Sequence, residues 1–200
     1  MIIKQLEIGA MDNFCYIVGC ETSRKALVID PGADVDHIVS AADQAGLTIE
    51  TIVNTHAHGD HTAGNAALKA LTGARIILHE GDAAGYPGAD EILTDEKTLQ
   101  LGTITFDIIH TPGHTPGGIC LHANGNLFTG DSLFVGDSGR TDLPGGDRPT
   151  LGASIRRLME LPDDTVVWPG HDYGPSPSST IGWEKRHNVN AREYGFHVPD

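Results

Sequence analysis

The chain has 200 residues, of which 39% are hydrophobic and 20% charged, and its formal net charge is −14. This length and composition predict one globular domain over residues 1–200 rather than a disordered, collagen-like or coiled-coil chain. The acidic excess disfavours binding to nucleic acid or to anionic membrane surfaces, because both are negatively charged. We therefore expect neither as a partner.

The three cysteines, Cys15, Cys20 and Cys120, favour a reducing compartment. An odd number cannot pair completely, and none are spaced as in a CxxC motif. We interpret all three as small core residues. The opening residues do not match a signal peptide, and no stretch approaches the ~20 apolar residues that span a bilayer. A cytoplasmic location is therefore expected.

In the first half, alternating or β-branched apolar runs are typical of strands. The predicted strands are Ile2–Ile8, Phe14–Val18, Lys25–Ile29, Ile49–Asn54 and Arg75–Leu78. Apolar residues at helical spacing predict helices over Val35–Ala45 and Thr62–Leu71, each followed closely by glycine. The segment Asp82–Lys97 is rich in Gly and Asp, and we expect a surface excursion there.

The second half repeats this order. The predicted strands are Ile104–His110, Ile119–His122, Leu127–Thr129 and Thr165–Trp168, and the predicted helices are Leu151–Met159 and Ile181–Glu193. A long loop rich in Gly and Asp is expected over Val135–Arg148. Two halves with the same order of elements predict an α/β fold in which two sheets pack face to face, with helices outside.

Four polar segments follow short apolar strands, and they carry an unusual set of metal-ligand side chains. The chain has 11 histidines, and His56-x-His58-x-Asp60-His61 places four potential ligands within six residues. The candidate ligands are His56, His58, Asp60, His61, His114, Asp131 and His171. Imidazole suits zinc and iron, whereas a carboxylate adds charge and can bridge two ions. A lone histidine is usually structural, but this clustering predicts a metal site.

The other histidines are not assigned as ligands. His37 and His187 fall on predicted helices and are expected on solvated faces, whereas His79 and His110 end strands and are expected to orient neighbouring groups. The contexts of His122 and His197 support no role.

The segments THAHGDHTAG, TPGHTPGG, TGDSLF and WPGHDYGP, in this order, resemble the metallo-β-lactamase superfamily, and within it the glyoxalase II-like (hydroxyacylglutathione hydrolase-like) branch. The resemblance implies a four-layer αβ/βα sandwich of two mixed sheets, with metals at one edge between them. By the family pattern, His56, His58 and His114 bind the first ion and Asp60, His61 and His171 the second, while Asp131 bridges both.

The resemblance also implies a reaction. Two divalent ions are expected, with zinc as the first choice and iron or manganese as alternatives. A hydroxide bridging the ions would attack a thioester of the S-2-hydroxyacylglutathione type, with Asp60 as the catalytic residue that orients this nucleophile. The expected partner is therefore a small thioester, and the oligomeric state is left open.

Arg140 and Tyr173 are candidates for substrate contact. Arg140 is a cation in an acidic loop and can hold a carboxylate, although an ion pair with Asp137, Asp142 or Asp147 is the simpler alternative. Tyr173 lies two residues after His171, and its alternative role is to pack a turn.

Two departures from the family pattern keep other functions open. Only 29 residues follow His171, so we expect the glutathione-binding C-terminal helical segment of eukaryotic-type enzymes to be missing or reduced. The segments Gly139–Asp142 and His171–Tyr173 also resemble persulfide dioxygenases, which by their pattern would hold one iron on His56, His114 and Asp131. A lactonase or phosphodiesterase of the same superfamily, or a metal-binding protein without turnover, are further alternatives.

Overall fold

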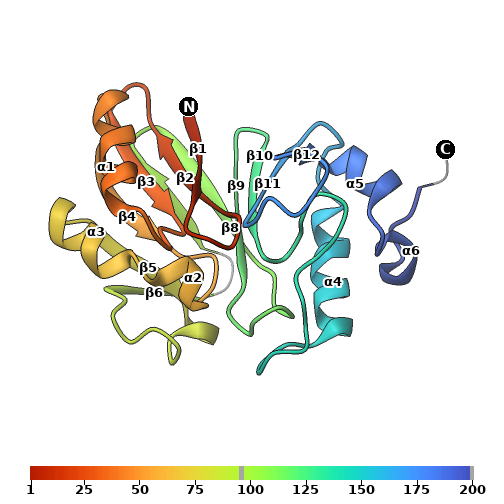
Figure 1. Cartoon of the computed structure of the whole chain (residues 1–200). Coiled ribbons are helices and arrows are strands. Elements are labelled where there is room, and N and C mark those ends of the chain that lie inside the picture. Colours follow the sequence, from red (N-terminus) through yellow and green to blue (C-terminus); the bar gives the residue numbers. More distant parts are fainter. Residues whose placement is uncertain (95–96, 199–200) are drawn as a thin grey trace.

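The computed structural model describes residues 1–94 and 97–198 of the chain. Two six-stranded sheets face each other, and helices cover the outer face of each sheet (Figure 1). The four layers are therefore helices, sheet, sheet and helices, as the resemblance implied.

The first sheet has the strand order β1-β2-β3-β4-β5-β6. Its strands are β1 (Ile2–Ile8), β2 (Asn13–Gly19), β3 (Lys25–Ile29), β4 (Thr48–Val53), β5 (Arg75–His79) and β6 (Glu91–Leu93). Strands β1 to β3 pair antiparallel, whereas β3 to β6 pair parallel. Helices α1 (Val35–Gln44) and α3 (Asn65–Thr72) cover its outer face, on the left of Figure 1.

The second sheet has the order β12-β11-β10-β9-β8-β7. Its strands are β7 (Thr98–Leu101), β8 (Ile104–His110), β9 (Ile119–Ala123), β10 (Asn126–Gly130), β11 (Val166–Pro169) and β12 (Ser179–Thr180). Helices α4 (Arg148–Leu158), α5 (Ile181–His187) and α6 (Ala191–Tyr194) lie on the right of Figure 1 and pack on this sheet's outer face.

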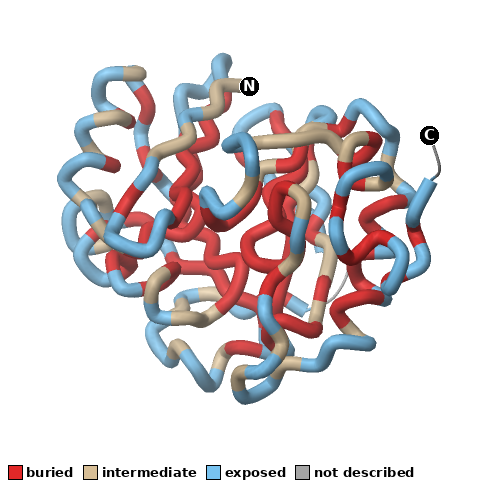
Figure 2. The backbone as a smooth tube through the Cα atoms, turned by 45° about the vertical axis from the view of Figure 1, so that its right-hand side comes forward, coloured by how far each residue is buried: buried red, intermediate tan, exposed pale blue. Residues whose placement is uncertain are grey.

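Strand β2 shows how the chain builds its core. Successive side chains of a strand point to opposite faces. Phe14 and Tyr16 therefore enter the core between the two sheets, whereas Cys15 and Ile17 enter the core under α1 and α3. A third core lies between the second sheet and helices α4 to α6. The buried backbone accordingly gathers in the centre of the molecule, with exposed segments outside it (Figure 2).

The long strands and most helices match the sequence predictions closely, but three predictions need correction. The helix predicted over Thr62–Leu71 is divided into the short α2 (Gly59–Thr62) and α3, because the Gly64 N–H donates to the Pro31 carbonyl and not within the helix. The expected surface excursion over Asp82–Lys97 contains β6, whose Leu93 is buried between the sheets; residues 95–96 lie outside the described part. Three residues are too few to show an alternating pattern. The predicted helix Ile181–Glu193 is two helices, α5 and α6, because the backbone leaves the helical region at Asn188.

The cysteines lie in the interior of the fold. Cys15, Cys20 and Cys120 are free thiols and all are buried, which confirms their interpretation as core residues. No helix within the described residues is long and apolar enough to cross a membrane.

Candidate metal centre

Strand direction brings the polar segments to one edge of the molecule. Strands β8, β10 and β11 run in the same direction, because β9 is antiparallel to β8 and β10 while β10 and β11 are parallel. Their carboxyl ends therefore lie at one edge. His114, Asp131 and His171 follow these three ends. In the first sheet, β3 and β4 are parallel, and their ends lead to Asp30 and His56.

Hydrogen bonds between the sheets close this edge. The Phe14 N–H donates to the Gly170 carbonyl at 2.8 Å, and the Ile119 N–H donates to the Thr55 carbonyl at 2.9 Å. Both bonds join the first sheet to the second beside a candidate ligand. The two halves of the ligand set are therefore held in a fixed relation.

The first cluster consists of His56, His58 and His114, whose candidate ligand atoms lie within 4.8 Å of one another. His114 Nε2 faces His58 Nδ1 at 3.0 Å. His114 Nδ1 lies 2.7 Å from the Arg140 carbonyl oxygen. Because a carbonyl can only accept, Nδ1 carries the proton and donates, which leaves a lone pair on Nε2.

The second cluster consists of Asp60, His61 and His171, also within 4.8 Å of one another. The two Nε2 atoms of His61 and His171 lie 3.2 Å apart. His171 Nδ1 donates to the Met11 carbonyl at 2.8 Å, and His61 Nδ1 donates to Asp30 Oδ2 at 3.0 Å. When these imidazoles are neutral, as metal binding requires, the same bonds leave lone pairs on the inward Nε2 atoms.

Asp131 lies between the two clusters. Its Oδ2 is 3.5 Å from His114 Nε2 and 3.4 Å from His171 Nε2, and its Oδ1 is 3.4 Å from His61 Nε2. Its side chain is 10% exposed. One carboxylate therefore contacts members of both clusters.

The donor set fits divalent metal ions. Four buried side-chain atoms have no hydrogen-bond partner in the described structure, and two of them, His56 Nε2 and Asp131 Oδ1, belong to candidate ligands of this site. Buried polar atoms are normally satisfied, so such orphans call for an explanation. Two nitrogen ligands of one tetrahedral zinc lie about 3.3 Å apart when each Zn–N bond is about 2.0–2.1 Å. The facing imidazole pairs, at 3.0 and 3.2 Å, approach that spacing.

Burial and the charges of neighbouring groups shift the pKa values of the candidate ligands. Burial lowers the pKa of His56 well below its usual value, and the neighbouring His61 reinforces this effect. Burial also acts to lower the pKa of His171, but hydrogen bonds to Asp131 and Asp60 outweigh it and raise the value to about 9. The pKa of Asp131 is lowered despite its burial, because the surrounding imidazoles favour the carboxylate.

Three residues that sequence reasoning missed support the ligands. Asp30 directly follows strand β3; it is buried and accepts hydrogen bonds from the Thr55 N–H at 2.7 Å and from His61. Asn13 Nδ2 donates to Asp60 Oδ2 at 2.9 Å. The signal available for Asp30 was its place directly after a strand parallel to β4.

The third missed residue is Asp82, inside the segment predicted to be a surface excursion. Its carboxylate accepts from the Ala57 N–H at 3.0 Å and from the Gly117 N–H at 2.7 Å. Asp82 thus ties the loop of His56 and His58 to the loop of His114. Its partners are backbone groups 25 and 35 residues away, which no local pattern shows.

A cavity of about 470 Å³ opens over the clusters. Both predicted substrate-contact residues line it, as do the apolar side chains of Met11, Phe134 and Leu143. The Tyr173 ring stacks on His171 with centroids 4.5 Å apart. Arg140 forms an exposed ion pair with Asp142 at 2.6 Å, which is the simpler alternative, and its contact with a substrate stays a prediction.

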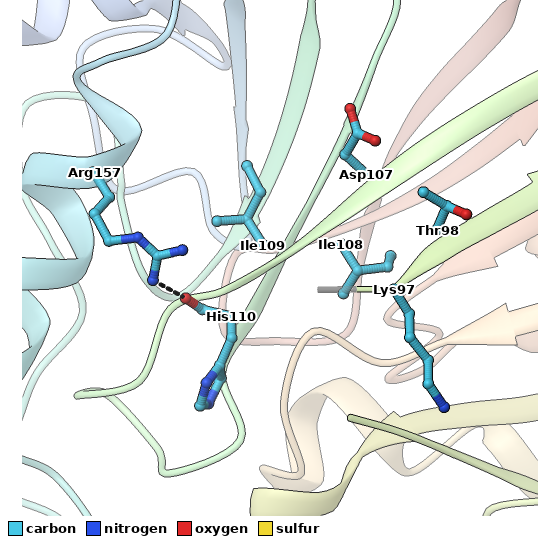
Figure 3. A pocket seen from close by; sticks show the side chains of 7 residues that line it. All are labelled: Lys97, Thr98, Asp107, Ile108, Ile109, His110 and Arg157. Atoms are coloured by element: carbon cyan, nitrogen blue, oxygen red, sulfur yellow. Dashed lines mark hydrogen bonds between the residues drawn. The ribbon is translucent and has the colours of Figure 1, made fainter. Parts of the chain in front are cut away.

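A second cavity, of about 320 Å³, lies at the β7–β8 edge of the second sheet (Figure 3). Arg157 donates to the His110 carbonyl there at 3.2 Å. None of the seven candidate ligands lines this cavity. His110 Nε2 donates to the Pro116 carbonyl at 2.9 Å, and the His110 ring stacks on that of His79. These contacts fit the prediction that both histidines orient neighbouring groups.

Comparison with known families finds a match over residues 8–171 to the metallo-beta-lactamase superfamily. Among curated relatives, a hydroxyacylglutathione hydrolase of Polaromonas sp. is 39% identical over 179 residues, which are 86% of this chain and 67% of that protein. The hydroxyacylglutathione hydrolase GloC of Haemophilus influenzae is 33% identical, over 94% of this chain and 97% of the relative. The chain thus spans about two thirds of one relative and nearly all of the other.

Solved structures show the same fold. ETHE1 from Myxococcus xanthus superimposes with a TM-score of 0.89 at 34% identity, over 99% of this chain and 89% of that chain. TTHA1623, crystallised in a di-iron-bound form, gives a TM-score of 0.81 at 32% identity, over 93% of this chain and 98% of that chain.

Proposed function

Because the chain belongs to the metallo-β-lactamase superfamily, we propose that it is a binuclear metal-dependent hydrolase that cleaves thioesters of the S-2-hydroxyacylglutathione type. The observation that carries the proposal is the position of Asp131 between two three-residue clusters of ligand side chains. The hydroxyacylglutathione hydrolases among the relatives support the substrate class, and the di-iron form of TTHA1623 supports two ions.

We assign His56, His58 and His114 to one ion and Asp60, His61 and His171 to the other, with Asp131 shared. One zinc ion takes about four ligands, so seven ligand side chains are enough for two ions. Divalent ions in such a site lower the pKa of water toward about 7 and polarise a carbonyl group. Zinc is our first choice, since it accepts the sulfur of a thiolate leaving group as readily as imidazole.

Asp60 is the residue we expect to orient the attacking water. Its side chain is 25% exposed and lines the cavity, while Asn13 holds its Oδ2. Hydrogen bonds to His171 and His61 keep its pKa below the usual range in spite of partial burial, so it stays an acceptor at neutral pH. A fixed carboxylate acceptor at the cavity floor directs a water lone pair toward the substrate carbonyl.

The part of the substrate that lies away from the reacting carbonyl group is expected at the mouth of the cavity. The Arg140 guanidinium is 62% exposed, and its partner Asp142 is 67% exposed. Exposed ion pairs contribute little to stability because water screens them, so a substrate carboxylate can replace Asp142 at modest cost. Tyr173 offers an aromatic face beside Met11 for the rest of the substrate. We therefore expect Arg140→Ala to raise KM more than it lowers kcat.

The test is metal analysis of freshly purified protein together with hydrolysis of S-lactoylglutathione as a representative thioester. We expect two metal ions per chain and thioester turnover that chelation abolishes and divalent metal restores. His171→Ala serves as the matched variant, because it removes a ligand of one cluster only. One ion per chain, or hydrolysis of lactones or phosphodiesters without thioester turnover, would contradict the proposal.

A second candidate is a mononuclear iron persulfide dioxygenase. The two unpartnered atoms among the candidate ligands, His56 Nε2 and Asp131 Oδ1, belong to the set His56, His114 and Asp131. Two histidines and one carboxylate are the ligand type of non-haem iron oxygenases. Oxygen consumption with glutathione persulfide by the iron-loaded protein, without thioester turnover by the zinc-loaded protein, would favour this candidate over the hydrolase.

A further inference from the structure

The loop of residues 136–140 reaches the proposed metal site from the side of the second sheet. The Arg140 carbonyl accepts a hydrogen bond from His114 Nδ1 at 2.7 Å. A Cβ atom on Gly139 would lie 1.9 Å from the Asp131 carbonyl oxygen, so the loop backbone rests directly on Asp131. Side chains of the same loop, including Ser138 and Arg140, line the cavity. The loop thus orients one proposed ligand and carries one proposed substrate contact.

Polar side-chain and backbone groups of the α5–α6 segment form hydrogen bonds to the other side of this loop. The Gly136 N–H donates to the buried Glu184 carboxylate at 3.0 Å, and the Val189 N–H donates to the Gly136 carbonyl at 2.9 Å. Asn188 Nδ2 donates to the Asp137 carbonyl at 3.0 Å. These bonds anchor the start of the loop to the break between the two helices.

Asn190 adds side-chain hydrogen bonds to two further groups of this loop. Its Nδ2 donates to Asp137 Oδ1 at 2.8 Å and to Ser138 Oγ at 3.1 Å, and its Oδ1 accepts from Arg148 Nη2 at 3.0 Å. The residue is 7% exposed. An amide group has two N–H donors and a carbonyl acceptor, and here all of them have protein partners. A buried amide used in this way fixes the position of the groups that it joins.

We infer that Asn190 is a positioning residue for the metal site: through Asp137 and Ser138 it holds the loop of residues 136–140 so that the Arg140 carbonyl orients His114. The inference rests on the proposed function only in that His114 is taken as a ligand. Groups that orient a metal-binding histidine affect metal affinity by about 10–100-fold. Asn190 contacts the loop and not His114 itself, so we expect its loss to lower the metal affinity by about tenfold, near the lower end of this range.

The test variant is Asn190→Asp. It keeps the shape of the side chain and the acceptor for Arg148 but places a carboxylate beside Asp137, where like charges repel. The double variant Asp137→Asn/Asn190→Asp reverses the pair, since the amide at 137 can donate to the carboxylate at 190. Glu193→Gln is the matched control: Glu193 lies in α6, which Asn190 caps, and pairs with Arg148, but within the described residues it forms no hydrogen bond or ion pair with the loop.

Two measurements read the effect. In the metal-free protein, we expect amide hydrogen exchange over residues 136–140 to be at least tenfold faster in Asn190→Asp and to return toward wild type in the double variant. Zinc affinity is measured in a His171→Ala background, which retains only the first cluster, and in a His114→Ala background, which retains the second. We expect a loss of about tenfold in the former and less than twofold in the latter.

Several results would overturn the inference. They are unchanged loop exchange, faster exchange with unchanged zinc affinity in the His171→Ala background, equal losses in both backgrounds, or no recovery in the double variant. If Asn190→Asp does not fold, Asn190→Ala, which adds no charge, is measured in the same way. Absence of thioester turnover by the wild-type protein would refute the proposed function and leave these outcomes intact.

Discussion

Replacing Asp30 with Asn tests whether a buried carboxylate outside the ligand set controls the metal site. Asp30 is 2% exposed and accepts from the Thr55 N–H, the Thr55 hydroxyl and His61 Nδ1 at 2.6–3.0 Å. The backbone at this position has φ 52°, which Asn adopts readily, so the substitution preserves the turn. Its effect therefore comes from the changed hydrogen-bond donors and acceptors.

An amide in place of the carboxylate has one acceptor atom where the native residue has two. If the amide oxygen accepts the Thr55 N–H, the amide NH2 group faces the His61 Nδ1–H. Two donors then face each other, and the hydrogen bond to His61 is lost. Hydrogen bonds to charged groups contribute about 1.5–3 kcal/mol. Since about 1.4 kcal/mol corresponds to a factor of ten, the affinity of the His61 cluster for its ion should fall about 10–100-fold.

The assay is calorimetric zinc titration of the metal-free protein, with thermal melting in parallel. In the opposite amide orientation, the buried Thr55 N–H loses its acceptor at a cost of about 1–3 kcal/mol. That loss would appear instead as a fall in Tm, at about 2–4 °C per kcal/mol for a chain of this size. Asp34→Asn is the matched control, because Asp34 also has positive φ and accepts a backbone N–H, from Gly9. Unchanged zinc affinity together with unchanged Tm would refute the reasoning.

Other perturbations test the site, the packing and the thiols. His171→Ala should reduce metal content toward one ion per chain, whereas Asp131→Ala should weaken both sites, as elemental analysis would show. Removal of metal by chelation should lower Tm and added divalent metal should restore it, because ligands of the native state stabilise it by mass action; an unchanged melt would contradict this coupling. Gly117→Ala should lower the free energy of unfolding by about 1–3 kcal/mol in urea titration, because its Cβ would lie 2.4 Å from the Asp82 backbone nitrogen. Gly59→Ala is the control: its Cβ would meet nothing within 4 Å, so its stability should be nearly unchanged. Burial raises the pKa of Cys120 to about 11, so Ellman's reagent at pH 8 should leave this thiol unlabelled until the protein unfolds.

Local sequence patterns were sufficient to predict the long strands, three of the helical regions and the candidate ligands. Strand β2 was predicted as a strand from its apolar run alone, and the structure adds that all its residues are buried. The ligand segment around His56 stands out because its residues are adjacent in the chain. Such features depend on residues a few positions apart, which is the range over which periodicity and motif spacing carry information.

Short elements and supporting contacts depended on the tertiary structure. Strand β6 has only three residues, and its pairing with β5 across the intervening loop makes it a strand. Asp30 looks like an ordinary turn residue until the parallel pairing of β3 and β4 brings it to Thr55 and His61. The joining of Asn190 to the loop of residues 136–140 spans more than 50 positions. The sequence alone therefore determined which side chains could bind metal, whereas the folded chain decided which carboxylates and amides hold them in place, because those hydrogen bonds join residues that only the packing of sheets and helices brings together.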